Sequence, residues 1–182
     1  MYIQAEEAAA LGVRITLARG SLNLAIEEGG NAVPGSVQDT DEILADCERV
    51  IARWHDRREG SMTQVALAPC APFNATKRLM TETAALAARH DCRMHTHLGE
   101  TRDEVAYCQE RFSCRPVDYF DEVGWMSDRA WVGWSGGNQV RKRLTGGGKR
   151  IRTVGSAAKG EAVPGAPSGF SRLQRPSCLF AE

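Results

Sequence analysis

Apolar positions along the first 134 residues follow two different spacings, and each spacing predicts one kind of element. Residues 39–55 carry apolar side chains at intervals of three and four, which is typical of one face of a helix. Residues 65–68, Val-Ala-Leu-Ala, form a short continuous apolar run, as expected for a strand buried on both faces. Residues 11–18 and 92–98 are also predicted to be strands, the first of them closed by Arg-Gly-Ser.

Capping residues mark where the other helices begin and end. Residues 101–104 have the S/T-x-x-E pattern of a capping box, so a helix is expected from there to about Phe112. Pro116 suits the first turn of a further short helix, and Gly124 suits its end. Residues 130–132 are predicted to begin a fourth strand. Thr76 can cap a helix whose inner side would hold Leu79, Met80, Thr83, Leu86 and Ala87.

This alternation of strands and helices predicts an α/β fold with parallel strands and right-handed crossovers. It fits either an open doubly wound sheet or a (β/α)8 barrel. The sequence contains neither G-x-G-x-x-G nor a P-loop, which removes the main phosphate-binding arguments for an open sheet. A full barrel needs about 250 residues, and the chain has 182. We therefore expect a partial TIM-type barrel of three or four units, roughly strands 3 to 6 of the complete fold.

Composition divides the chain into residues 1–134, the partial barrel, and residues 135–182, a Gly-rich basic tail. The first segment has 14 Lys/Arg against 21 Asp/Glu, the second 9 against 2, and the tail also holds 9 of the 18 glycines. We expect the tail to be disordered or not native to the domain, as a frameshift would make it. A basic tail can also be a nucleic-acid arm, but Phe170 and Phe180 are its only aromatic residues, so no nucleic-acid partner is predicted.

Other features of the sequence point to the cytoplasm. No run of about 18 apolar residues is present, so no membrane span is expected. The first residues lack the basic and apolar regions of a signal peptide. No two of the six cysteines have C-x-x-C spacing, and we interpret them as reduced thiols.

The segment with the clearest chemistry is His95-Thr96-His97-Leu98-Gly99-Glu100. On a strand, residues two apart point to the same face, so both imidazoles would face a barrel interior near the carboxyl end of the strand. Imidazole is a good zinc ligand, and a nearby carboxylate can move protons to and from metal-bound water. Two histidines on one strand can equally be hydrogen-bonded core residues. Glu100 and the capping Thr101 favour a functional interpretation.

This segment, extended to Thr101, resembles the fifth-strand motif of the amidohydrolase superfamily, and in particular of its members that deaminate purines, pyrimidines and triazines. Ala66-Leu67-Ala68-Pro69-Cys70-Ala71-Pro72-Phe73 is similar to the fourth-strand segment of the same group. Residues 12–21 resemble its third strand, and Arg115-Pro116-Val117-Asp118-Tyr119 resembles the helix before its sixth. The resemblance covers about residues 3–132 and is strongest to the 8-oxoguanine deaminase and triazine aminohydrolase group.

The resemblance implies a role for each matching residue. His97 would be a ligand of one divalent metal ion, Zn²⁺, and Glu100 would take a proton from the metal-bound water and deliver it to the leaving amine. Cys70 stands where many relatives have His, and in the 8-oxoguanine group a Cys there is associated with recognition of the C8 carbonyl. His95 would be a pocket residue that supports the site by a hydrogen bond. The substrate would be a small nucleobase-like molecule and the parent enzyme a homo-oligomer.

Several features of the family are absent from the printed sequence. These are the first-strand H-x-H ligand pair, a sixth-strand His after Val132, and the metal-binding Asp of the eighth strand. His55 and His90 are expected at exposed helix ends. A catalytic zinc takes about three protein ligands, so we expect the isolated chain to bind zinc weakly and to be inactive. The open alternatives are a fragment of a triazine or guanine aminohydrolase and a non-catalytic remnant of the barrel.

Overall fold

The structure is a computed structural model that describes residues 2–133 and 152–154. The predicted tail lies outside the described residues except for residues 152–154. These three residues form a strand, where the composition had predicted loop or disordered chain. Among the described residues, no helix is both long and apolar enough to span a membrane.

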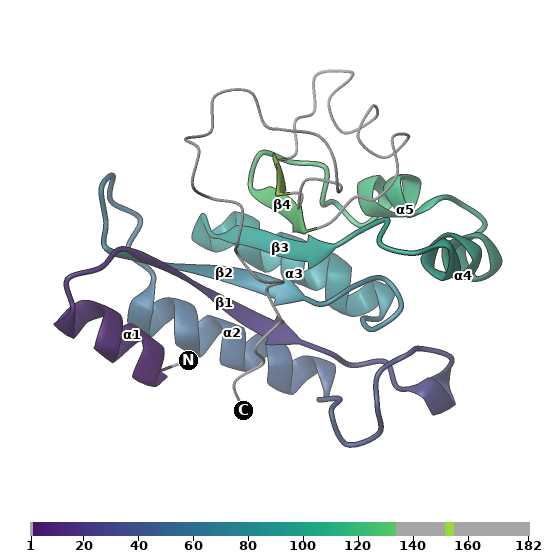
Figure 1. Cartoon of the computed structure of the whole chain (residues 1–182), viewed down its shortest axis with the longest axis horizontal. Helices are drawn as coiled ribbons and strands as arrows, with labels where there is room; N and C mark the ends of the chain where they lie inside the picture. The colour runs from purple at the N-terminus through teal and green to yellow at the C-terminus, as the bar shows by residue number, and fades with distance from the viewer. Residues whose placement is uncertain (1, 134–151, 155–182) are drawn as a thin grey trace, which may run out of the picture.

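The elements alternate as the sequence pattern predicts, and Figure 1 shows them in chain order. The helices are α1 (Tyr2–Ala10), α2 (Thr40–Trp54), α3 (Lys77–His90), α4 (Arg102–Phe112) and α5 (Pro116–Glu122), with a short 3-10 helix at Ile26–Glu28. The strands are β1 (Ile15–Ser21), β2 (Thr63–Pro69), β3 (Arg93–His97), β4 (Ala130–Gly133) and β5 (Arg152–Val154).

All described strands belong to one parallel sheet whose spatial order, β1-β2-β3-β4-β5, is the order of the sequence. A doubly wound sheet would reverse its order at a switch point. Here each strand is added on the same side of the one before, as in a (β/α)8 barrel. The prediction of a parallel α/β fold that forms part of a barrel is therefore confirmed.

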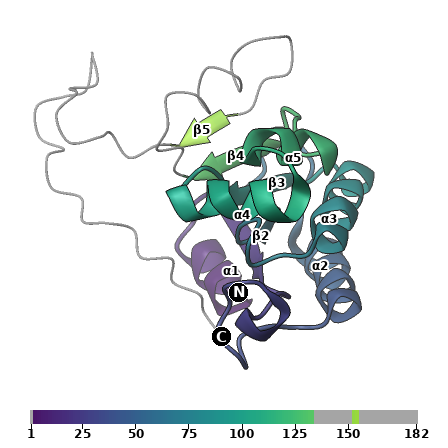
Figure 2. The ribbon, with the colours of Figure 1, turned by 90° about the vertical axis from the view of Figure 1, so that its right-hand side faces the viewer.

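One face of the sheet packs against helices. Figure 2 shows α2 and α3 side by side against the sheet. Leu17, Val65 and Leu67 are at most 3% exposed, and the registers of the strand pairs align them with Met94 and Ala130. All five α3 positions predicted to face inward are buried. The residues that alternate with these, such as Ala66, Ala68 and His95, lie on the opposite face.

The N-terminal region departs from the predicted pattern. Residues 2–10 form α1, whose signal was its alanine content, since Ala has the highest helix propensity. Leu11 and Val13 flank a turn at Gly12 (φ 67°), are 74% and 49% exposed, and lie before the first residue of β1. β1 begins at Ile15 and continues through residues 19–21 because its backbone pairs with the whole length of β2.

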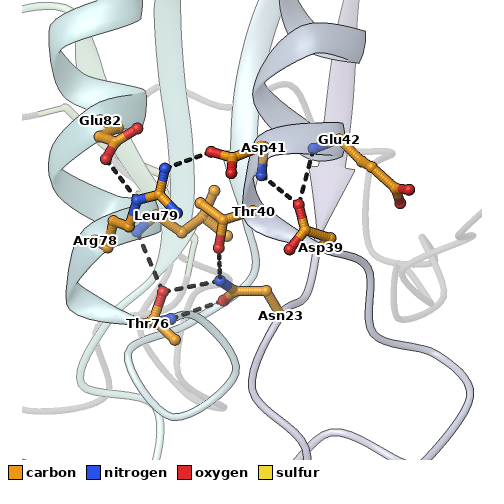
Figure 3. A network of polar contacts seen from close by, with 9 residues as sticks. All are labelled: Asn23, Asp39, Thr40, Asp41, Glu42, Thr76, Arg78, Leu79 and Glu82. Atoms are coloured by element: carbon orange, nitrogen blue, oxygen red, sulfur yellow. Dashed lines mark hydrogen bonds and ion pairs between the residues drawn. The ribbon is translucent and has the colours of Figure 1, made fainter.

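A polar network ties together the loops that follow β1 and β2 (Figure 3). The Asn23 side chain donates to Thr40 Oγ1 and Thr76 Oγ1, both at 2.8 Å, and accepts from the Thr76 amide at 2.8 Å. Thr76 also caps α3 by accepting from the Leu79 amide, as predicted, and Asp39 caps α2. One amide side chain thus joins the first turns of two neighbouring helices, which fixes two loops at the carboxyl edge of the sheet.

His55 and His90 are half-buried, so the prediction that both are exposed is wrong. His55 follows α2, and its Nδ1 accepts a hydrogen bond from the Val65 amide at 3.0 Å. This acceptor exists only in the neutral imidazole. Burial is the main cause that lowers the pKa of His55 below its usual 6.5.

We expect the free energy of unfolding to fall as the pH drops below about 6.5, in part because of His55. A lowered pKa in the folded state means that the unfolded chain takes up the proton first, so acid favours unfolding. Replacement of His55 by Asn, whose Oδ1 can accept from Val65, should reduce this pH dependence. Urea unfolding at pH values from about 5 to about 8, the range in which histidine titrates, measures it in the parent chain and in the variant. An unaltered slope in His55→Asn would contradict the assignment.

Candidate active site

Hydrogen bonds join the carboxyl ends of the first three strands into one edge. The Cys70 amide donates to the Ser21 carbonyl at 3.1 Å. The Cys70 carbonyl in turn accepts two hydrogen bonds, from the His97 amide at 2.8 Å and from Thr96 Oγ1 at 2.9 Å. Thr96 is 1% exposed, so this second bond is shielded from water. Cys70 is therefore fixed beside the strand end that carries His97.

His95 and His97 lie on the face of the sheet opposite the helices, as their spacing predicts. Their ring centroids are 5.4 Å apart, and the rings meet edge to face. Residues Met94, Thr96 and Leu98, which alternate with them, are buried. Both imidazoles are half-buried, so they are positioned by the strand while keeping some access from the barrel interior.

His95 is held by β4. Its ring stacks on Trp131, with centroids 5.0 Å apart and 23° between the planes. Its Nδ1 lies 3.3 Å from the Trp131 carbonyl oxygen, a hydrogen bond when Nδ1 carries the proton. Burial, followed by the neighbouring His97, lowers the pKa of His95. These contacts hold the His95 ring in place, and its role in supporting the site stays a prediction.

The space next to the two imidazoles depends on a glycine. A Cβ at Gly133 would lie 3.0 Å from His97 Nδ1 and 3.2 Å from His95 Cε1. A side chain there would push against both rings, so Gly133 lets β4 approach β3 closely at the end of the strand pair. The sequence had marked residue 133 only as the position where the family pattern stops.

Glu100 lies in the short loop between β3 and α4, three residues after His97. Gly99 has φ 68°, a left-handed conformation that glycine adopts without strain. Thr101 caps α4 by accepting from the Glu104 amide at 3.2 Å, as the capping pattern predicts. The Glu104 carboxylate reaches further back than predicted and accepts from the amides of Gly99 and Glu100, both at 2.8 Å. The Glu100 side chain itself is exposed.

The Cys70 thiol is the third predicted site group. Cys70 is half-buried and, like the other described cysteines, it is not part of a disulfide. The sheet therefore brings the backbones of Cys70, His97 and the Glu100 loop to the same edge. Which atoms of a substrate these side chains contact stays a prediction.

The donor set for a metal ion is incomplete in the part of the chain that the structure describes. Residues 2–133 contain no group of three or more His, Cys, Asp or Glu side chains that could hold a metal. His97 offers one imidazole on the face of the sheet opposite the helices, and a catalytic zinc takes about three protein ligands. The described residues alone do not fit a complete metal centre.

Sequence reasoning did not identify Thr96, Gly133 or the full role of Glu104. Thr96 and Gly133 act through partners 26 and 36 residues away, and no local pattern encodes those contacts. Glu104 was visible as part of the capping pattern, but its hydrogen bonds to the preceding loop follow from the tertiary structure.

Comparison with known proteins shows the family of the chain. Residues 1–132 match the sequence profile of the amidohydrolase family. The chain is 42% identical to the 8-oxoguanine deaminase of Pseudomonas aeruginosa over 180 residues. The aligned residues make up 99% of this chain and 38% of that enzyme. The chain belongs to the amidohydrolase family.

Other relatives act on triazines. The chain is 35% identical to the hydroxydechloroatrazine ethylaminohydrolase of a Pseudomonas species over 72% of this chain and 27% of that enzyme. The zinc-complexed atrazine chlorohydrolase of Arthrobacter aurescens has a similar structure, with a TM-score of 0.68, 30% identity, and coverage of 71% of this chain and 28% of that one. The chain thus spans between about a quarter and two fifths of the length of these relatives.

Proposed function

We propose that the described barrel segment is part of a hydrolase that removes an exocyclic amine from a purine such as 8-oxoguanine. The observation that carries this proposal is the joined carboxyl edge, where the Cys70 carbonyl accepts from the His97 amide and the Glu100 loop follows directly. The identity to an 8-oxoguanine deaminase supports the substrate class. The similarity to triazine hydrolases supports a triazine as the second candidate.

In this proposal Glu100 is the proton carrier. Its exposed carboxylate takes a proton from the attacking water and delivers it to the amine nitrogen, which leaves as ammonia. His97 would supply one ligand of a divalent metal ion, zinc by analogy with the atrazine chlorohydrolase structure. A bound zinc ion makes water reactive at neutral pH. The ion's other ligands would come from residues other than those described.

Cys70 would contact the carbonyl at C8 of the purine. Two hydrogen bonds to its own carbonyl fix its backbone next to His97, so its half-buried side chain has a defined place at the edge of the site. A thiol is a weak donor, which suits a contact that selects a substrate without binding it tightly. The predicted homo-oligomer, the cytoplasmic location and the division at residue 134 stay predictions.

The test uses a completed barrel, in which residues 1–132 are joined to the strands that the Pseudomonas aeruginosa relative has and these residues lack. Ammonia release is measured with 8-oxoguanine, guanine and a hydroxylated triazine. We expect 8-oxoguanine to give the highest kcat/KM, and Cys70→Ala, which removes the S–H donor, to lower this preference by about 10-fold, as loss of one contact in a pocket does. Fastest turnover of the triazine would favour the second candidate.

The printed chain is a necessary comparison. Since its described residues hold no complete set of metal ligands, we expect no ammonia release above that of its own Glu100→Gln variant. Turnover by the printed chain would show that residues outside the described part complete the site. A completed barrel that is folded but inactive towards all three substrates would contradict the proposed function.

A further inference from the structure

Glu104 is fully buried, and it is the only charged side chain among residues 2–133 that is buried. A buried carboxylate is costly unless hydrogen bonds satisfy it. Burial is the main cause that raises the pKa of Glu104, while hydrogen bonds from the preceding loop act in the opposite direction. A residue of this cost calls for a reason beyond helix capping, which the Thr101 hydroxyl already provides.

The two carboxylate oxygens are divided between two successive amides. Oε1 accepts from Gly99 and Oε2 accepts from Glu100, each at 2.8 Å. Gly99, with its φ of 68°, turns the backbone so that both N–H groups face the same carboxylate. Hydrogen bonds to a charged acceptor are about twice as strong as neutral ones. The loop backbone is therefore fixed from two points by one side chain.

This arrangement matters for Glu100 because packing does not hold its side chain. Glu100 is exposed, whereas the residue two positions earlier, Leu98, is 0% exposed and anchors the end of β3. Between that anchor and α4, the only hydrogen bonds that the structure shows for the amides of residues 99 and 100 are those that they donate to Glu104. Glu104 therefore fixes the backbone of Glu100, and with it the point where the Glu100 side chain begins.

We propose that Glu104 is a positioning residue that holds the Glu100 backbone at the distance from His97 that proton transfer requires. This inference rests on the proposed function for the role of Glu100, although its structural part can be tested without any turnover. Glu104 is 0% exposed and bonded to the loop amides, so in this proposal it acts through the loop and not on the substrate itself.

The structural test measures amide hydrogen exchange by NMR in the full printed chain and in Glu104→Gln. Glutamine has the same shape but only one acceptor oxygen, so one of the two amides keeps its partner and the other faces an NH₂ group. We expect one of the Gly99 and Glu100 amides to exchange about 10- to 100-fold faster, relative to the Met94 amide in the core, as loss of a charged hydrogen bond implies.

Cys108→Ala is the matched control for stability. Cys108 lies one turn further along α4, is 0% exposed, and does not contact the loop amides through any hydrogen bond that the structure shows. Its truncation should lower global stability without changing the exchange of residues 99 and 100 relative to Met94. If Glu104→Gln changes that ratio no more than Cys108→Ala does, Glu104 is structural only and the proposal fails.

The functional test uses the completed barrel. Glu104→Gln should lower kcat by about 10-fold or more with KM nearly unchanged, because a misplaced catalytic group slows the chemical step more than binding. An unchanged kcat would overturn the positioning role even if the amides exchange faster. If the parent completed barrel has no activity, the proposed function fails, and the exchange measurement still decides whether Glu104 fixes the loop.

Discussion

Replacement of Glu100 by Gln in the completed barrel should lower kcat for deamination by about 10²- to 10⁴-fold, the usual contribution of a positioned general acid-base group. Glutamine keeps the length and shape of the side chain but cannot accept a proton at neutral pH. Because the Glu100 side chain is exposed and only its amide is bonded to Glu104, the fold should be unaffected. Steady-state ammonia release measures the effect.

Glu110→Gln is the control for this variant. Glu110 is also exposed and lies on α4, well past the loop that carries Glu100. It should keep the kcat of the parent protein. A Glu100→Gln protein that loses less than about 10-fold in kcat would show that another group carries the proton, since general acid-base groups contribute more than that. In that case the assignment of Glu100 would be wrong.

The elements that the sequence predicted well are those with local signals. Asp39 and Thr76 each cap the helix that was expected to follow, because a capping side chain bonds amides two or three residues away. Residues 11–13 were predicted to belong to a strand because they continue a short apolar run. Such a run does not show where pairing with another strand begins. The start of β1 is set instead by the bond from the Ile15 amide to the Met62 carbonyl, 47 positions along the chain.

The same division applies to the site. The spacing of His95 and His97 predicts one shared face, and the rings do lie on one face. The place of Glu100 after the strand follows from the motif. The bond from Thr96 to Cys70, the stack of Trp131 on His95 and the closeness of Gly133 to both rings depend on strands that meet only in the folded sheet. Parallel pairing of the strands brings residues 70, 97 and 133 together. The spacing of residues within any one segment does not predict this pairing.

Truncation of Trp125 to Ala should have the largest effect on stability, lowering the free energy of unfolding by about 3–5 kcal/mol. Trp125 is 0% exposed, its Nε1 donates to the Met80 carbonyl at 2.9 Å, and its ring lies 5.3 Å from that of Phe120. It joins α3 and α5 where the chain turns towards β4. Domains have about 5–15 kcal/mol of stability in total, so the variant should be close to unfolding at room temperature.

Urea unfolding followed by circular dichroism measures this loss. Trp125→Phe keeps an aromatic ring and gives up the hydrogen bond to Met80 and part of the buried volume, so it should lose clearly less than the alanine variant. Val105→Ala, at a position 44% exposed, should lose about 0.5 kcal/mol or less. If Trp125→Ala is no less stable than Val105→Ala, the packing of α5 against α3 does not hold β4 in place. The approach of Gly133 to His97 would then be supported by the pairing of β4 with β3 alone.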